Sequence, residues 1–158
     1  LKETNSNPFE SLLLNCFESD KSSTLVMFAV DDLLFLKPIA NFKAILNLLL
    51  NDRRYLAVQL RLHQNVKYSQ TAARACTPPR SWQIIDNHDE CGEWQWVDND
   101  ALLEWKLPFD LSGGIYRFND VYEITRHLKL LHGVESLSHP NKFEVIGNKI
   151  LLNHSIEC

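Results

Sequence analysis

The stretch LVMFAVDDLLFLKPI, residues 25–39, places two adjacent aspartates inside a run of apolar residues. The apolar residues before the pair are continuous, which is typical of an inner strand covered on both faces of a sheet. Burying one carboxylate without compensation is costly, and two neighbouring carboxylates repel each other. We therefore predict a strand over residues 24–30, with Asp31 and Asp32 leaving the core at its end.

The segment after the aspartates shows first a helical and then a strand period. Residues 41–54 carry apolar side chains at helical spacing, and Asn41 is the expected N-cap. Residues 55–63 alternate, with Leu56, Val58, Leu60 and Leu62 on one face and Ala57, Gln59, Arg61 and His63 on the other. Strand, helix and strand in this order predict a three-layer α/β fold with a mostly parallel sheet and flanking helices.

The rest of the chain is predicted to be irregular in the middle and helical towards both ends. Residues 64–93 are polar and contain prolines, so we expect a long loop, which in compact domains is usually functional or disordered. A glycine turn and a short strand are expected over 112–118. A helix over 119–132 follows, capped by Asn119 and ended by Gly133. Its apolar stripe comprises Val121, Ile124, Leu128 and Leu131, and further helices are expected from Phe9 and near Pro140.

The composition indicates one globular domain over residues 1–158. A formal net charge of −4 gives no basic footprint for nucleic acid, and no apolar run approaches the roughly 20 residues that span a bilayer. Four scattered cysteines without a CxxC pair, and no recognisable leader, favour a cytoplasmic protein with reduced thiols. The first residue is Leu rather than Met, which indicates a piece of a longer chain.

The aspartate pair is the first candidate site. Side chains at the carboxyl end of a strand point into the crevice where α/β folds bind ligands. Carboxylate oxygens there suit Mg²⁺ or Mn²⁺, which take one or two protein carboxylates together with substrate phosphate oxygens. Neighbouring side chains diverge in an extended backbone, so one aspartate would bind the metal and the other a sugar hydroxyl. The alternative is a turn in which the aspartates bond local backbone amides.

The stretch LPFDLSGGIYR, residues 107–117, is the second candidate. Ser112, Gly113 and Gly114 would let the backbone approach a ligand closely, and Asp110 lies just upstream as an acid or base. The alternative interpretation is an ordinary glycine turn with a solvated aspartate.

Tryptophans and acids alternate between residues 94 and 105. Sugar sites place aromatic rings beside carboxylates, but indole rings are also large core residues, and the acids also suit helix caps. The residues concerned are Trp94, Trp96, Trp105, Asp98, Asp100 and Glu104. His139 is a candidate third metal ligand, although a lone histidine is more often structural. The GxSxG, P-loop and GxGxxG motifs of common hydrolases, NTPases and dehydrogenases are absent.

Four stretches, FAVDDLLFLKPI, VQLRLHQN, EWQW to LPFDLSGGIYR, and HPNKFE, follow one another between about residues 24 and 145. In this order they resemble nucleotide-sugar-dependent glycosyltransferases of the GT-A fold, of a bacterial type with a DxD-like motif. The resemblance implies sugar transfer from a nucleotide-diphosphate donor to a carbohydrate acceptor, with Mn²⁺ or Mg²⁺ bridging protein and pyrophosphate. It makes Asp32 a metal ligand and places Asp31 towards the ribose or a metal-bound water. Ser112, Gly113 and Gly114 would line the donor-sugar and acceptor side.

The chain departs from that family in two ways. An acidic residue precedes the glycine where this sequence has Ser112, and the family's fold begins with a nucleotide-binding βαβ segment where this sequence has only a short stretch before Asp31. Asp110 is the expected substitute for the catalytic base, with Asp98 and Asp100 in reserve. Two other functions stay open. One is a non-catalytic α/β module, derived from such an enzyme, that binds carbohydrate or protein. The other is a metal-dependent phosphoryl-transfer or hydrolytic enzyme, since an aspartate pair after a strand serves phosphate chemistry equally well.

Overall fold

The computed structural model describes residues 8–19, 22–31, 33, 35, 38–39, 41–69, 72–85, 91–97, 100 and 102–153. The α-helices are α1 (Phe9–Ser19), α2 (Phe42–Asn51), α3 (Phe118–His132) and α4 (Pro140–Asn153), and the 3₁₀ helices are η1 (Leu103–Lys106) and η2 (Val134–Leu137). The strands are β1 (Leu25–Met27), β2 (Ala57–Gln59), β3 (Tyr68–Ser69), β4 (Arg74–Ala75), β5 (Gln83–Ile84), β6 (Gly92–Glu93) and β7 (Gly114–Arg117).

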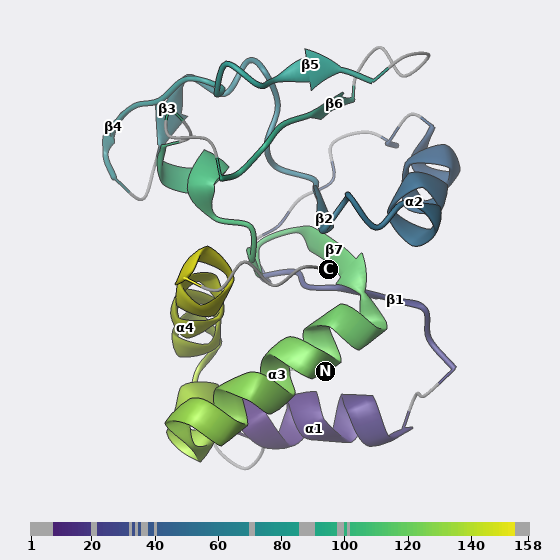
Figure 1. Cartoon of the computed structure of the whole chain (residues 1–158), viewed down its shortest axis with the longest axis vertical. Coiled ribbons are helices and arrows are strands. Elements are labelled where there is room, and N and C mark those ends of the chain that lie inside the picture. The colour runs from purple at the N-terminus through teal and green to yellow at the C-terminus, as the bar shows by residue number, and fades with distance from the viewer. Residues whose placement is uncertain are drawn as a thin grey trace.

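The architecture is mixed α/β, as predicted. In Figure 1, α1, α3 and α4 gather below the sheet formed by β1, β7 and β2, and α2 lies above it with the small strands β3 to β6. The predicted order of strand, helix and strand is confirmed by β1, α2 and β2.

The sheet differs from the predicted mostly parallel one, because β7 lies between β1 and β2 and runs antiparallel to both. Leu25 pairs with Arg117 on one side of β7, and Ala57 pairs with Tyr116 on the other. The strands β1 and β2 therefore share a direction without touching. Every strand pair in the described part of the chain is antiparallel, and a GT-A-like parallel sheet is not seen.

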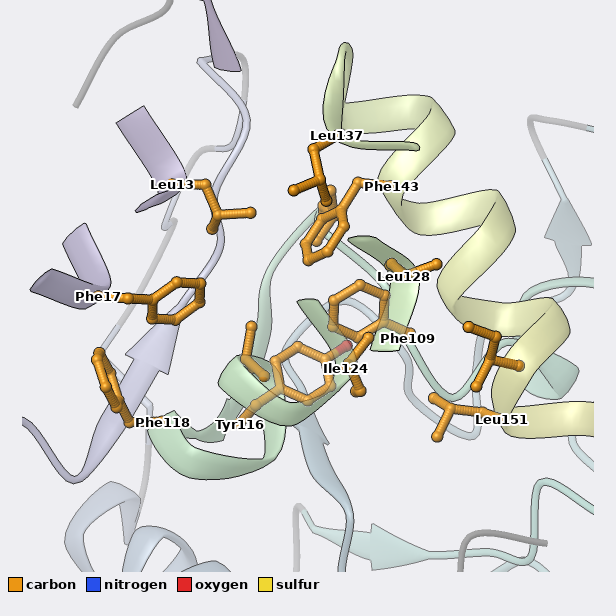
Figure 2. Packing of buried hydrophobic residues seen from close by; sticks show 13 residues of the cluster. Leu13, Phe17, Phe109, Tyr116, Phe118, Ile124, Leu128, Leu137, Phe143 and Leu151 are labelled. Carbon is orange, nitrogen blue, oxygen red and sulfur yellow. The ribbon is translucent and has the colours of Figure 1, made fainter. Parts of the chain in front are cut away.

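The main core fills the space between the sheet and the three helices below it (Figure 2). All four residues of β7 are buried, and Tyr116 and Phe109 stand at the centre with no exposed surface. Phe109 meets Phe143 of α4 edge to face, with ring centroids 5.1 Å apart. Because full burial of one such side chain stabilises a fold by about 1.5–3 kcal/mol, this cluster holds β7 and the helices together.

The helix ends show where sequence patterns misplace a boundary. The helix α3 begins at Phe118 rather than after Asn119, and it ends before Gly133, whose φ of 69° suits glycine. Leu131, predicted in the apolar stripe, is 55% exposed because the stripe leaves the core one turn earlier, at Leu128. Asn41 does precede α2, but its φ is 54° and its side chain makes no capping hydrogen bond.

Arg117 ties β7 to its neighbours from a buried position. Its Nη1 donates to the carbonyl of Leu49 at 2.5 Å and its Nη2 to that of Tyr55 at 2.7 Å. Its Nε pairs with Asp120 at 2.6 Å. The contact with Leu49 supplies a donor to the last turn of α2, where helix carbonyls lack intrahelical partners. The guanidinium thereby fixes α2 and the start of β2 against the central strand.

The region predicted as a long polar loop contains regular structure in its described residues. The strands β3 and β4 form one hairpin and β5 and β6 another. Beneath them, Trp82, Trp94 and Trp105 pack against one another with ring centroids 5.2–6.0 Å apart. Trp105 has no exposed surface, whereas Trp94 and Trp96 are partly exposed.

Two broader findings concern the described residues only. None of their helices is long and apolar enough to cross a membrane. Cys16 and Cys76 form no disulfide.

Candidate functional site

Three chain segments meet at one end of the sheet. The amide of Gly113 donates to the carbonyl of Phe28 at 3.0 Å, and the amide of Leu60 donates to the carbonyl of Gly113 at 3.1 Å. Phe28 follows β1 and Leu60 follows β2, whereas Gly113 precedes β7. The carboxyl ends of the two like-directed strands therefore flank the glycine turn, and we call this place the sheet end.

The turn requires its glycines. Gly113 has a φ of 100°, a conformation that L side chains rarely adopt. A Cβ on Gly114 would lie 2.3 Å from the carbonyl oxygen of Asp110 and 2.5 Å from Oη of Tyr116. A Cβ on Gly113 would contact Leu33 and Leu60, each at 3.7 Å. Gly113 thus permits the positive φ, and Gly114 permits the close approach of the backbone, while Leu33, after the aspartate pair, lies against this turn.

Asp31 lies at the sheet end and is exposed. It sits in a turn closed by a hydrogen bond of 3.1 Å from the amide of Leu33 to the carbonyl of Val30. Asp32 lies outside the described residues. Within the described part of the chain, no group of three or more His, Cys, Asp or Glu side chains is close enough to hold a metal ion. The predicted metal site therefore offers, in the described residues, the single exposed carboxylate of Asp31.

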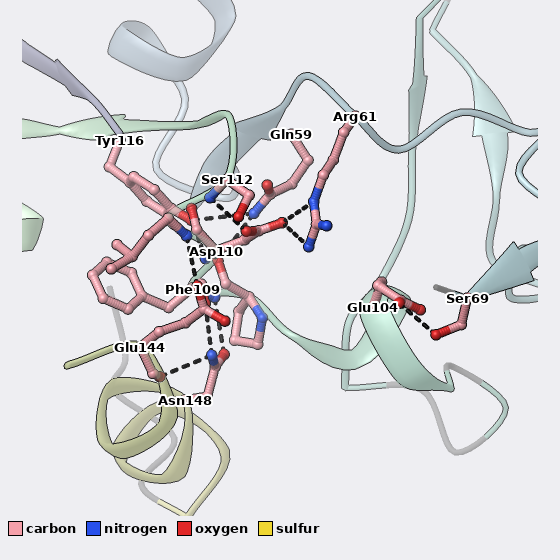
Figure 3. A network of polar contacts seen from close by, with 12 residues as sticks. Gln59, Arg61, Ser69, Glu104, Phe109, Asp110, Ser112, Tyr116, Glu144 and Asn148 are labelled. Atoms are coloured by element: carbon pink, nitrogen blue, oxygen red, sulfur yellow. Dashed lines mark hydrogen bonds and ion pairs between the residues drawn. The ribbon is translucent and has the colours of Figure 1, made fainter. Parts of the chain in front are cut away.

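Asp110 is the most enclosed acid of the cluster in Figure 3, with 3% of its surface exposed. Its Oδ2 accepts a hydrogen bond from Nε of Arg61 at 2.7 Å and forms an ion pair with Nη2, also at 2.7 Å. Its Oδ1 accepts from the amide of Ser112 at 2.7 Å. Both carboxylate oxygens are therefore engaged, one by a guanidinium and one by the glycine turn. The alternative interpretation, in which Asp110 is solvated, is wrong.

Arg61 and Gln59 come from one face of the strand segment around β2. Gln59 Nε2 donates to Oη of Tyr116 at 3.2 Å, and Arg61 reaches Asp110. The Tyr116 hydroxyl in turn donates to the Asp110 carbonyl at 3.0 Å, and burial raises its pKa. The sequence gives no sign that Gln59 and Arg61 belong to a site. The alternation over residues 55–63 places both on one face of a strand, but it does not indicate which residues they contact.

The helix α4 contributes two further polar side chains. Asn148 pairs with the Phe109 backbone, accepting from its amide at 3.0 Å and donating to its carbonyl at 2.6 Å. Glu144 accepts from the amide of Leu111 at 2.9 Å. Burial raises the pKa of Glu144, and the charge of Asp110 adds to this, while the Leu111 amide and Arg61 act in the opposite direction. Both residues lie in or after the stretch HPNKFE, yet sequence reasoning assigned them no role.

The other predicted site residues have separate surroundings. Asp100 accepts from the amide of Arg80 at 2.8 Å and pairs with its guanidinium at 3.7 Å. Asp98 lies outside the described residues. His139 is exposed and precedes α4, where its Nδ1 accepts from the amide of Asn141 at 3.1 Å. This bond makes His139 an N-cap, and its predicted role as a metal ligand stays a prediction.

A cavity of about 240 Å³ lies between α2, β2 and the hairpin of β5 and β6. Its walls are mainly apolar and include Trp82 and Trp94, and Gln59 belongs both to this cavity and to the cluster at the sheet end. At its polar side, the hydroxyl of Tyr55 donates to Glu93. The pKa of Tyr55 is raised to about 12, mainly by this hydrogen bond and to a smaller extent by burial.

Comparison with known proteins gives one informative match. No family model and no solved structure matches the chain. The chain is 30% identical over 160 aligned residues to the bifunctional glycosyltransferase pgtA of Dictyostelium discoideum. The match takes in 99% of this chain and 20% of that protein, so the chain spans about one fifth of its relative's length.

Proposed function

We propose that this chain belongs to a glycosyltransferase that moves a sugar from a nucleotide-diphosphate donor to a carbohydrate acceptor. One observation carries the proposal, namely the 30% identity to a bifunctional glycosyltransferase along 99% of the chain. The aligned region includes both the aspartate pair and the glycine turn. A match of this extent favours a common reaction, whereas a match to one short motif would not.

The geometry of the sheet end supports the proposal. In α/β folds, ligands bind outside the carboxyl ends of the strands, and here β1 and β2 both end beside the glycine turn. The exposed Asp31 and the partly exposed Arg61 come from these two strand ends. We further propose a GT-A-like arrangement in which the antiparallel β7 lies between two like-directed strands.

The proposed metal is Mn²⁺ or Mg²⁺, held by Asp32 and Asp31. An exposed carboxylate at a strand end fits such a cation, which fills its remaining positions with water and substrate phosphate oxygens. When bound, the cation would offset negative charge on the departing diphosphate. His139 remains a proposed third ligand through the ring nitrogen that does not cap α4.

A thermal-shift assay with Mn²⁺ and UDP or GDP tests the proposal, since a ligand that binds only the native state raises the melting temperature. We expect stabilisation in the wild-type protein and its loss in Asp32→Ala. Asp52→Ala, at the end of α2, is the matched control and should keep the shift. Absence of a shift with every nucleotide would contradict the proposal.

Product analysis then separates the reaction classes. A glycosyltransferase moves a labelled sugar from donor to acceptor, whereas a hydrolytic or phosphoryl-transfer enzyme releases free sugar or phosphate. A binding module would bind carbohydrate in the absence of nucleotide and would not convert a nucleotide sugar.

A further inference from the structure

We propose that Arg61 binds the diphosphate of the donor, and that Asp110 is a positioning residue that holds Arg61 for this task. The inference rests on the proposed function for the identity of the ligand. It concerns two residues at the sheet end, one exposed and one enclosed (Figure 3).

The enclosure of Asp110 limits what its carboxylate can reach. Its side chain is 4% exposed, its Oδ1 is bonded to the amide of Ser112, and its Oδ2 is bonded twice to Arg61. An acceptor hydroxyl would have to displace one of these charge-assisted contacts to give its proton to Asp110. The geometry therefore favours a role for Asp110 in holding other groups.

Arg61 keeps binding capacity after pairing with Asp110. A guanidinium has five N–H donors, and the contacts with Asp110 use one on Nε and one on Nη2. The side chain is 36% exposed, so solvent and ligands can reach part of it. Such a planar fork matches phosphate oxygens in pairs.

The charge distribution points to the same residue. The hydrogen bonds and ion pairs that hold the glycine turn involve two acids, Asp110 and Glu144, and the guanidinium of Arg61. A diphosphate needs positive charge, and the protein's own contribution here comes from this guanidinium. Because Asp110 already fixes Arg61, less side-chain freedom is lost when the anion binds.

Inorganic pyrophosphate is the probe, because it carries the proposed recognition group without base or sugar. Calorimetric titration with and without Mg²⁺ would compare the wild-type protein with Arg61→Lys and with the double variant Arg61→Met/Asp110→Asn. The double variant leaves no unpaired buried charge, so it tests binding even where Arg61→Ala fails to fold. Arg126→Ala, which removes an exposed arginine paired with Glu123 on α3, is the matched control.

We expect the double variant to bind pyrophosphate about tenfold to a hundredfold more weakly, the loss typical of one charge-assisted contact. Arg61→Lys should give an intermediate loss, and the control should match the wild type. If the wild-type protein does not bind pyrophosphate, or if the double variant binds it equally well, the inference is wrong.

Asp110→Asn tests the positioning role, because the two possible roles of Asp110 predict opposite changes in the affinity for pyrophosphate. A nearby negative charge without a positioning role would weaken anion binding, so its removal would tighten pyrophosphate binding. If Asp110 holds Arg61, its replacement should instead weaken binding in the folded protein. Tighter binding by Asp110→Asn would overturn this part of the inference.

Sugar-transfer assays keep this inference separate from the proposed function. Sugar transfer by the wild-type protein, with pyrophosphate binding independent of Arg61, would refute the inference alone. Pyrophosphate binding that depends on Arg61, without turnover of any nucleotide sugar, would refute the proposed transferase and leave the anion site standing.

Discussion

Asn148→Asp probes the link between α4 and the segment that carries Asp110. The substitution keeps an oxygen that accepts from the Phe109 amide, but it replaces the donor that lies 2.6 Å from the Phe109 carbonyl by a second oxygen. The same donor also reaches the Glu144 carbonyl at 3.0 Å. The variant therefore turns two attractive contacts into repulsive ones in a site that is 4% exposed.

The expected loss follows from these contacts. A buried carbonyl without its donor costs about 1–3 kcal/mol, and the Phe109 carbonyl loses its side-chain partner. Placing a carboxylate against two carbonyls adds to this, so we expect a total of about 2–4 kcal/mol. For a chain of this size the melting temperature should fall by roughly 4–16 °C.

Asn51→Asp is the matched control, because Asn51 also donates from Nδ2 to a carbonyl four residues earlier in its helix, that of Asn47 at 2.8 Å. It is exposed, so its loss should stay below about 1 kcal/mol. Urea unfolding of both variants and the wild type measures the difference. A loss below about 1 kcal/mol for Asn148→Asp would refute the proposed role of the Phe109 pairing.

The deficit of Asn148→Asp should also depend on pH. A protonated carboxyl can again donate to the Phe109 carbonyl, so the folded-state pKa of the introduced group lies above its unfolded-state value of about 3.9. The folded state then binds the proton more tightly than the unfolded state. The deficit is therefore full above the folded-state pKa and shrinks as the pH falls through it.

Further variants test other parts of the fold. Gly114→Ala should lower the free energy of unfolding, measured with urea, by about 3 kcal/mol, because its Cβ would lie 2.3 Å from a carbonyl oxygen. Gly133→Ala meets no atom within 4 Å, so its cost of about 1–3 kcal/mol should come from the positive φ of 69° alone. Burial raises the pKa of Glu144, so the ionised carboxylate is less stable in the folded state than in the unfolded state. Glu144→Gln should therefore raise the free energy of unfolding at neutral pH. In acid, where Glu144 is protonated, the free energies of unfolding of the variant and the wild type should become equal. Glu93→Gln should lower the pKa of Tyr55 from about 12, as measured by ultraviolet titration.

Local elements of this fold could be predicted because short-range patterns determine them. The apolar spacing in residues 41–54 predicts α2, and the glycine after α3 marks its end. The strand that pairs with β1 is far from it in the sequence. Leu25 pairs with Arg117, some ninety residues later, and no local period indicates that β7 inserts between β1 and β2. A strand–helix–strand pattern fixes the direction of β1 and β2, but not what lies between them.

The candidate site also has a part that local sequence patterns predict and a part that depends on long-range contacts. Proximity in sequence marked Asp110, Ser112 and the glycines as one turn, and the structure confirms that they form one. The residues that contact this turn are distant in sequence, because Arg61 follows β2 and Glu144 lies on α4. Two-residue strands such as β3 and β5 were missed for a related reason, because such short segments contain no full period.

The structure resolves the electrostatic difficulty of the aspartate pair for Asp31. The apolar run ends in a turn, and Asp31 is exposed, so its carboxylate escapes the desolvation that burial would impose. The buried acid of the site is Asp110 instead, and the protein compensates it with Arg61 and the Ser112 amide. One carboxylate is thus neutralised within the fold, and the other is left available to a ligand. The sheet end thus combines an enclosed acid that the fold pairs internally with an exposed acid that it leaves to solvent.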